Sequence, residues 1–286
     1  MFKMSLRYWL IAVVLLTSVI VGLTFGHMIW ASHANNANSG SIHTKTPPAL
    51  ATITLPQDKE QFTPFLLVVQ LHTTVTWNNA DTVSHVATTT AQQSQFLNRQ
   101  AFSLHLPAGG KAQFTFNQAG LYHYYDPTRS TWNPTLGRVA ADKGTPLFPL
   151  AMDGIIWVEG TISGLPVAAL NTIPAGHDEF ASEFLAISQP GAVTWHNLDE
   201  DPHFVGLVSG WSSPVNPVDI GLYRIAGTDD VPGGAAVTVL FNTPGLYYYY
   251  CRNHDQIDLS TSRVRALSKA SEYPIPMEGF VLVMGT

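Results

Sequence analysis

Cysteine is almost absent from this chain, which has only Cys251 among its 286 residues. A single cysteine cannot form a disulfide within the chain, so a fold held together by disulfides is excluded. Charge is also scarce, because Asp, Glu, Lys and Arg together make up 12% of the sequence. The formal net charge is −6, and the lack of a basic surplus argues against nucleic acid as a partner.

The N-terminal segment is a long apolar run. Lys3 and Arg7 precede residues Tyr8–Trp30, whose sequence is YWLIAVVLLTSVIVGLTFGHMIW. This run is long enough to span a bilayer, and the positive charges before it predict that the downstream residues lie outside the cytoplasm. A following SHA tripeptide could be a signal-peptidase site, so residues 1–34 are either a cleaved signal peptide or a membrane anchor. Residues 35–50, rich in Asn, Ser, Gly and Pro, are predicted to be a tether.

An internal repeat organises the remaining residues. Three blocks recur in the same order, and the spacing between the second and third blocks is the same in both copies. The pairs are VTWNNADTVSH and VTWHNLDEDPH (75–85 and 193–203), FNQAGLYHYYD and FNTPGLYYYYC (116–126 and 241–251), and MDGIIWV and MEGFVLV (152–158 and 277–283). The first pair is offset by 118 residues and the other two by 125. We therefore predict two tandem domains, at residues 51–162 and 163–286.

Both copies have the residue pattern of β structure. Segments such as AQFTFN, AVTVLFN, GLYYYY and GFVLVM are short, rich in Val, Phe and Tyr, and bounded by Pro, Gly and Asn. No amphipathic helical pattern competes with them, so the predicted fold is all-β, with two Greek-key sandwiches. One exception is the segment STSRVRALSKASEY, residues 260–273, which could form a short helix.

The repeated blocks resemble those of the cupredoxins, the blue or type 1 copper proteins that include plastocyanin. The pattern consists of VTWxNxDxxxH, then GxYxYxCxxH, and finally MxGxVxV before the last strand. It covers nearly all of the second repeat and, apart from the cysteine, nearly all of the first. The resemblance implies a type 1 copper site in the second repeat, with His203, Cys251, His254 and Met277 as its ligands. The loop between His254 and Met277 is much longer than in plastocyanin-like proteins.

The chemistry of such a site suits these residue types. A type 1 site takes two imidazoles and one thiolate in a plane, with a weak axial thioether. A mixed nitrogen and sulfur cage accommodates both Cu(I) and Cu(II), which favours fast electron transfer. Metal binding would also protect an otherwise free thiol in an oxidising compartment. The sequence thus predicts one type 1 copper per chain, in an extracytoplasmic electron carrier whose partners are redox donor and acceptor proteins.

The first repeat departs from this pattern. His85 and Met152 stand at ligand positions, but Asp126 replaces the cysteine and Arg129 replaces the second histidine. A guanidinium does not deprotonate to bind metal, so we expect Arg129 to pair with Asp126 in the space of the copper. A hard-metal site formed by His85, Asp126 and His123 is the alternative, and the positive charge of Arg129 disfavours it.

Two classes of function remain open. The first is a mononuclear electron carrier, and the second is a copper enzyme like the two-domain nitrite reductases or the multicopper oxidases. Such enzymes need a further copper site between domains or subunits. Oxidases place histidines on both sides of the cysteine, whereas Tyr250 and Arg252 flank Cys251 and the chain has no His-x-His pair. The oxidase is therefore disfavoured, while a second site assembled from scattered histidines stays open.

Overall fold

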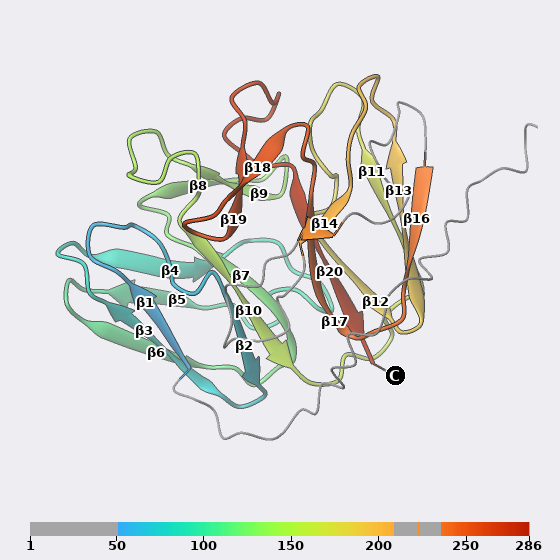
Figure 1. Ribbon diagram of the computed structural model, residues 1–286. Helices are drawn as coiled ribbons and strands as arrows, with labels where there is room; N and C mark the ends of the chain where they lie inside the picture. Colours follow the sequence, from blue (N-terminus) through green and yellow to red (C-terminus); the bar gives the residue numbers. More distant parts are fainter. Residues whose placement is uncertain (1–50, 209–221, 224–235, 286) are drawn as a thin grey trace, which may run out of the picture.

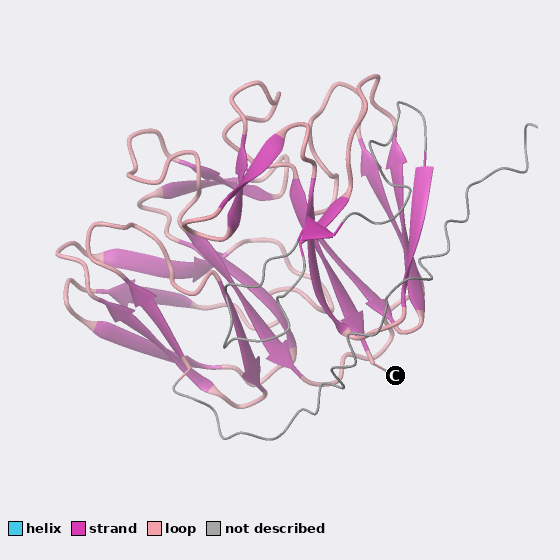
Figure 2. Ribbon diagram, viewed as in Figure 1, coloured by secondary structure: helices cyan, strands magenta, loops and turns pink. Residues whose placement is uncertain are grey.

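The computed structural model describes residues 51–208, 222–223 and 236–285. The predicted N-terminal anchor and tether lie outside these residues. The described part consists of strands, turns and loops, and Figure 2 shows no helix in it. In this part of the chain, no helix is long and apolar enough to cross a membrane. The predicted all-β architecture is confirmed for the described residues.

Ten strands form the first sandwich (Figure 1). Its smaller sheet has the strand order β1-β3-β6, its larger sheet has the order β2-β10-β7-β4-β5, and β8 and β9 form a separate hairpin. The strands are β1 (Thr52–Leu55), β2 (Leu66–Gln70), β3 (Thr74–Asn79), β4 (His85–Thr89), β5 (Ser103–Leu106), β6 (Lys111–Thr115), β7 (Gly120–Tyr125), β8 (Ser130–Asn133), β9 (Arg138–Ala141) and β10 (Asp153–Glu159).

The second sandwich repeats this strand order. Its sheets are β11-β13-β16 and β12-β20-β17-β14-β15, and its separate hairpin is formed by β18 and β19. Even the parallel pairs recur, because β1-β3 and β2-β10 have their counterparts in β11-β13 and β12-β20. The strands are β11 (Ala168–Ile173), β12 (Phe184–Ser188), β13 (Gly191–Asn197), β14 (Gly206–Val208), β15 (Leu222–Tyr223), β16 (Ala236–Phe241), β17 (Gly245–Tyr250), β18 (Asp255–Asp258), β19 (Arg263–Ala266) and β20 (Glu278–Met284).

Each sandwich has its own core, and a third apolar cluster joins the two. Trp77 is fully buried in the first core and Trp195 in the second. The joining cluster draws on β2, β7 and β10 of the first sandwich and on β12, β17 and β20 of the second. Within it, Phe280 stacks on Phe184 and on Tyr248, with ring centroids 5.3 and 4.5 Å apart. Because each buried large apolar side chain contributes about 1.5–3 kcal/mol, this cluster holds the sandwiches together.

The tyrosine run of β17 leads directly to Cys251. Successive side chains of a strand point to opposite faces of the sheet. Leu246, Tyr248 and Tyr250 therefore pack in the cluster between the sandwiches, whereas Tyr249 and Cys251 pack in the core of the second sandwich. This alternation explains why the thiol faces the interior of the second sandwich.

The expected short helix over residues 260–273 is absent, and that expectation was wrong. The segment contains β19, which pairs antiparallel with β18, and is otherwise made of turns and loop. Val264 is fully buried in the cluster between the sandwiches and pairs with Ile257 across the hairpin. The hairpin turn is closed by Asp258, whose carboxylate accepts hydrogen bonds from the backbone and hydroxyl of Ser260. Burial of a β-branched residue in a strand therefore outweighs the local helical tendency.

Candidate metal site

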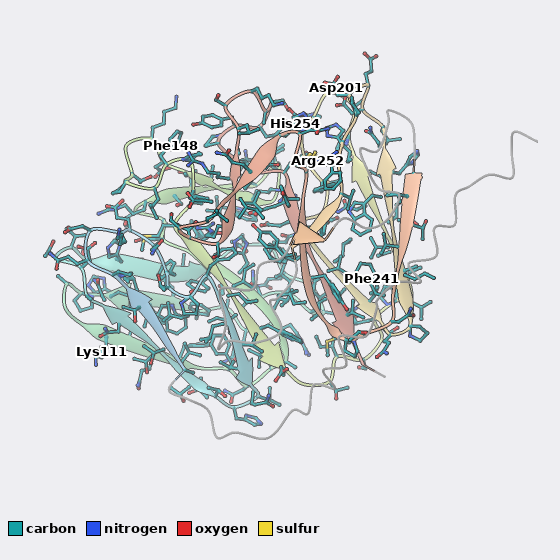
Figure 3. All side chains as sticks on the ribbon, in the orientation of Figure 1. Lys111, Phe148, Asp201, Phe241, Arg252 and His254 are labelled. Carbon is teal, nitrogen blue, oxygen red and sulfur yellow. The ribbon has the colours of Figure 1, made fainter. Side chains whose placement is uncertain are left out.

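The predicted ligands of the second repeat all lie at strand ends. His203 precedes β14, Cys251 directly follows β17, and Met277 directly precedes β20. Because β14, β17 and β20 are neighbours in one sheet, these positions meet at one end of the sandwich. His254 follows Cys251 in the turn before β18. Figure 3 shows His254 at this end, near the labelled Asp201.

Two imidazoles and the thiol form a compact buried group. The Sγ atom of Cys251 lies 3.5 Å from Nδ1 of His254 and 3.9 Å from Nδ1 of His203. The two ring centroids are 4.8 Å apart. His203 and Cys251 are fully buried, and His254 is 9% exposed. The backbone N–H of Phe204 donates a hydrogen bond of 3.2 Å to Sγ, as would suit a thiolate. Three soft or borderline donor atoms thus converge at a largely buried position of the second sandwich.

Met277 is held beside this group through its backbone. Its carbonyl accepts a hydrogen bond of 3.0 Å from the N–H of Cys251, and its own N–H donates to the buried carboxyl group of Asp255 at 3.1 Å. The Met277 side chain is fully buried in the same core cluster as Cys251. The MEG motif needs glycine at its third position, because a Cβ atom on Gly279 would lie only 2.4 Å from the Tyr249 hydroxyl. The motif therefore lets β20 approach the tyrosine run closely.

Burial decides the protonation state of the thiol when no metal is bound. It raises the pKa of Cys251 to about 12, although backbone N–H groups, that of Phe204 first, oppose the shift. The metal-free thiol is therefore protonated at neutral pH. A metal ion that binds Sγ must displace this proton, so binding is coupled to proton release.

Two carboxylates that sequence reasoning missed complete the site. Nε2 of His203 lies 3.0 Å from Oδ2 of Asp199, and Nε2 of His254 lies 3.1 Å from Oδ1 of Asp178. A histidine that donates its outer N–H to a carboxylate keeps the lone pair of the other nitrogen free for a metal. Burial raises the pKa of Asp199, but hydrogen bonds from Gly176 and His203 outweigh it and lower that pKa below its usual value. Asp199 is therefore ionised at neutral pH.

The same positions of the first sandwich hold charged groups in place of a metal site. Nδ1 of His85 lies 2.7 Å from Asp126, and its Nε2 lies 3.3 Å from Asp81. The expected pair between Arg129 and Asp126 does not form, because Arg129 pairs with Glu60 at 2.7 Å. Glu60 and Asp178 are related by the 118-residue offset, and so are Asp81 and Asp199. In both sandwiches, a carboxylate thus lies next to each of the two basic side chains. These carboxylates are Asp199 and Asp178 in the second sandwich and Asp81 and Glu60 in the first.

The third residue of the hard-metal alternative lies elsewhere. Nε2 of His123 is 2.9 Å from Asp153, and its Nδ1 is 3.8 Å from Glu183 of the second sandwich. His123 therefore belongs to the contact between the sandwiches, whereas His85 and Asp126 pair with each other. Among the described residues, each group of three or more potential ligands that converge closely enough to hold a metal ion includes His203.

The chain has structural neighbours among solved proteins but matches no protein family. No protein-family model and no curated protein matches the chain. Among solved structures, it is similar to a "Novel Purple Cupredoxin from Nitrosopumilus maritimus", at 22% identity and a TM-score of 0.26, over 38% of this chain and 99% of that one. It is also similar to amicyanin from Paracoccus versutus, at 21% identity and a TM-score of 0.27, over 41% of this chain and 81% of that one.

Proposed function

We propose that this chain is a cupredoxin-like electron-transfer protein with one type 1 copper in its second sandwich. The observation that carries the proposal is the approach of two imidazole Nδ1 atoms to one buried thiol, at 3.5 and 3.9 Å. Two nitrogen donors and one thiolate are the in-plane ligands of a type 1 site. Met277, whose backbone is hydrogen-bonded to that of Cys251, is the proposed axial ligand.

The residues of the chain fit such an ion. When bound, copper would supply one-electron redox chemistry at the Cys251 sulfur and the two ring nitrogens. Asp199 and Asp178 orient the rings, because Asp199 accepts a hydrogen bond from Nε2 of His203 and the carboxylate of Asp178 pairs with Nε2 of His254 at 3.1 Å. The complete burial of His203 and Cys251 excludes bulk water from these two ligands. Ligands fixed at strand ends rearrange little between two oxidation states, and this favours rapid electron exchange.

The proposal extends to the architecture. The two sandwiches share their strand order and the offsets of their sequence blocks, which supports a tandem pair of cupredoxin-like domains at residues 51–162 and 163–286. The first domain has His85, Asp126 and Arg129 at the ligand positions, so we assign it no copper.

We also propose an extracytoplasmic location. Its support is the sequence alone: Lys3 and Arg7 precede the apolar segment Tyr8–Trp30, as in a signal peptide or a membrane anchor. Redox proteins of that compartment are the proposed donor and acceptor. A buried thiol that binds metal would be protected there from oxidation and mispairing.

Exchange of the thiol for a hydroxyl tests the function. Copper-loaded wild-type protein should show the intense visible absorption of a Cu(II)–thiolate bond, and Cys251→Ser should abolish it. Asp126→Asn is the matched control, because Asp126 occupies the corresponding position of the first sandwich and should not affect the colour. Far-ultraviolet circular dichroism would verify that both variants keep the β fold. A wild-type protein without the absorption band, or a Cys251→Ser variant that keeps it, would refute the proposal.

A further inference from the structure

Arg138 belongs to the first sandwich, but its guanidinium donates hydrogen bonds to the second. It lies at the start of β9 and is only 2% exposed. Its Nη1 donates a hydrogen bond of 2.8 Å to the carbonyl of Glu278, and its Nη2 donates one of 2.6 Å to the carbonyl of Phe180. The carboxylate of Glu183 lies 3.9 Å from Nη1. These acceptors all belong to the second sandwich, so Arg138 forms a polar bridge from one half to the other.

The two carbonyl groups belong to segments that carry parts of the metal site. Glu278 directly follows Met277, the proposed axial ligand. Phe180 lies two residues after Asp178, whose carboxylate lies 3.1 Å from Nε2 of His254. One guanidinium therefore ties the Met277 strand to the loop that orients His254. These segments are far apart in the sequence, and Arg138 spans them with its two Nη atoms.

The chemistry of arginine suits this role. A guanidinium presents several N–H groups in a fixed plane and can donate to two separate carbonyl groups at once. Lysine carries the same charge on a flexible stem and cannot reproduce that fork. Glu183 supplies a nearby opposite charge for the buried cation. A residue needed only as a positive charge would not require both carbonyl contacts.

We infer that Arg138 is a positioning residue through which the first sandwich sets the geometry of the metal site in the second. This inference rests on the proposed copper function. It gives the first sandwich a role although Asp126 and Arg129 replace its own ligands. Loss of the fork should let the Met277 strand and the loop of Asp178 shift relative to each other.

The chain contains a matched control for this role. Arg263 is related to Arg138 by the same 125-residue offset and lies at the start of β19. It reaches in the opposite direction, because its Nη1 donates to the carbonyl of Ala151 at 2.6 Å and its Nη2 donates to the carboxylate of Asp153. Both acceptors belong to the first sandwich. Arg263 is thus a second buried bridge, 6% exposed, whose hydrogen bonds go to the half without the proposed copper ligands.

The test compares the full-length variants Arg138→Lys and Arg263→Lys after loading with Cu(II). Visible and electron paramagnetic resonance spectra, the reduction potential and the copper dissociation constant are measured, together with thermal unfolding. Arg138→Lys should weaken copper binding by about tenfold or more, as is typical when a residue that supports metal ligands is removed. It should also change the spectra and raise the potential, because the thioether donor is displaced. Arg263→Lys should lose thermal stability but keep the copper spectra and the potential of the wild type.

The outcomes separate this inference from the function on which it rests. If wild-type protein shows no type 1 spectrum, the proposed function fails and the inference fails with it. If the wild type is blue and Arg138→Lys has the same spectra, reduction potential and copper affinity as the wild type, only the inference is overturned. Equal copper-site changes in both variants would also overturn it, because they would reflect a general weakening of the contact between sandwiches. Should Arg138→Lys fail to fold, the charge-balanced double variant Arg138→Gln/Glu183→Gln is measured against the same criteria.

Discussion

Removal of the carboxylate behind His203 should weaken metal binding strongly. Asp199 accepts a hydrogen bond from Nε2 of His203 at 3.0 Å, and Asp199→Ala deletes that acceptor. Loss of such a partner typically costs about 10- to 100-fold in metal affinity, or about 1.4–2.7 kcal/mol. Because the His203 side chain is 0% exposed, water cannot readily replace the lost acceptor. We therefore expect a loss near the upper end of that range.

The equivalent change behind His254 should have a smaller effect. The His254 side chain is 11% exposed and that of Asp178 is 12% exposed, so a water molecule can take the place of the carboxylate. Asp178→Ala should therefore cost about tenfold in affinity. Asp199→Asn keeps an acceptor oxygen and should bind copper more tightly than Asp199→Ala.

A competition titration against a chelator of known affinity measures these differences. Asp81→Ala is the control, because Asp81 lies behind His85 at the corresponding position of the first sandwich. It should leave the copper affinity at the wild-type value. Copper binding by Asp199→Ala within about twofold of wild type would contradict the claim that this carboxylate supports the ligand. So would an equal loss in Asp81→Ala.

Three further predictions concern the axial ligand, the first sandwich and the topology. Met277→Leu should retain a coloured copper site with a higher reduction potential, since a donor to Cu(II) is lost; an unchanged potential in voltammetry would exclude Met277 as a ligand. Burial lowers the pKa of His85, but the hydrogen bonds to Asp126 and Asp81 outweigh it, so its pKa is raised in the folded state. That stabilisation is complete below the unfolded pKa of about 6.5 and is lost as pH rises through the folded pKa. In thermal unfolding of the metal-free proteins, His85→Gln should therefore lose less stability than the wild type as pH is raised. An identical pH dependence in the two proteins would contradict this reasoning. Finally, protease added outside intact cells should cleave the chain, whereas complete protection would place it in the cytoplasm.

The proposed ligands His203, Cys251 and Met277 could be identified because each lies in a repeated block near a strand end, and His254 because it completes the pattern GxYxYxCxxH just after the second block. Strand alternation in GLYYYYC predicts that Cys251 and Tyr249 share a face, and the structure places both in the second core. Asp199 also had a sequence signal, because the repeated pattern NxDxxxH contains it and Asp81. The pattern does not reveal that this aspartate accepts from the histidine four residues later. That contact depends on the loop conformation, in which the N–H of Asp199 bonds to the side chain of Asn197.

Other parts of the site had no usable sequence signal. Asp178 and its counterpart Glu60 lie in loops whose sequences, PAGHDEFASE and PQDKEQFTPF, share little beyond a proline and a phenylalanine. Their partners, His254 and Arg129, are more than sixty residues away in the sequence. Arg129 was expected to pair with the nearby Asp126, but Glu60 lies within reach in the folded chain and Asp126 is already bonded to His85. Contacts between distant loops follow from the packing of strands, which local patterns do not specify.

Copper stoichiometry together with electron paramagnetic resonance tests the central claim most directly. The account predicts one tightly bound copper per chain, because His203, Cys251 and His254 converge in the second sandwich while Asp126 and Arg129 occupy the matching positions of the first. Its Cu(II) spectrum should have the narrow hyperfine splitting of a thiolate-bound type 1 site. Two tightly bound coppers per chain, one of them without a thiolate signature, would contradict the account and favour a copper enzyme with a second metal site.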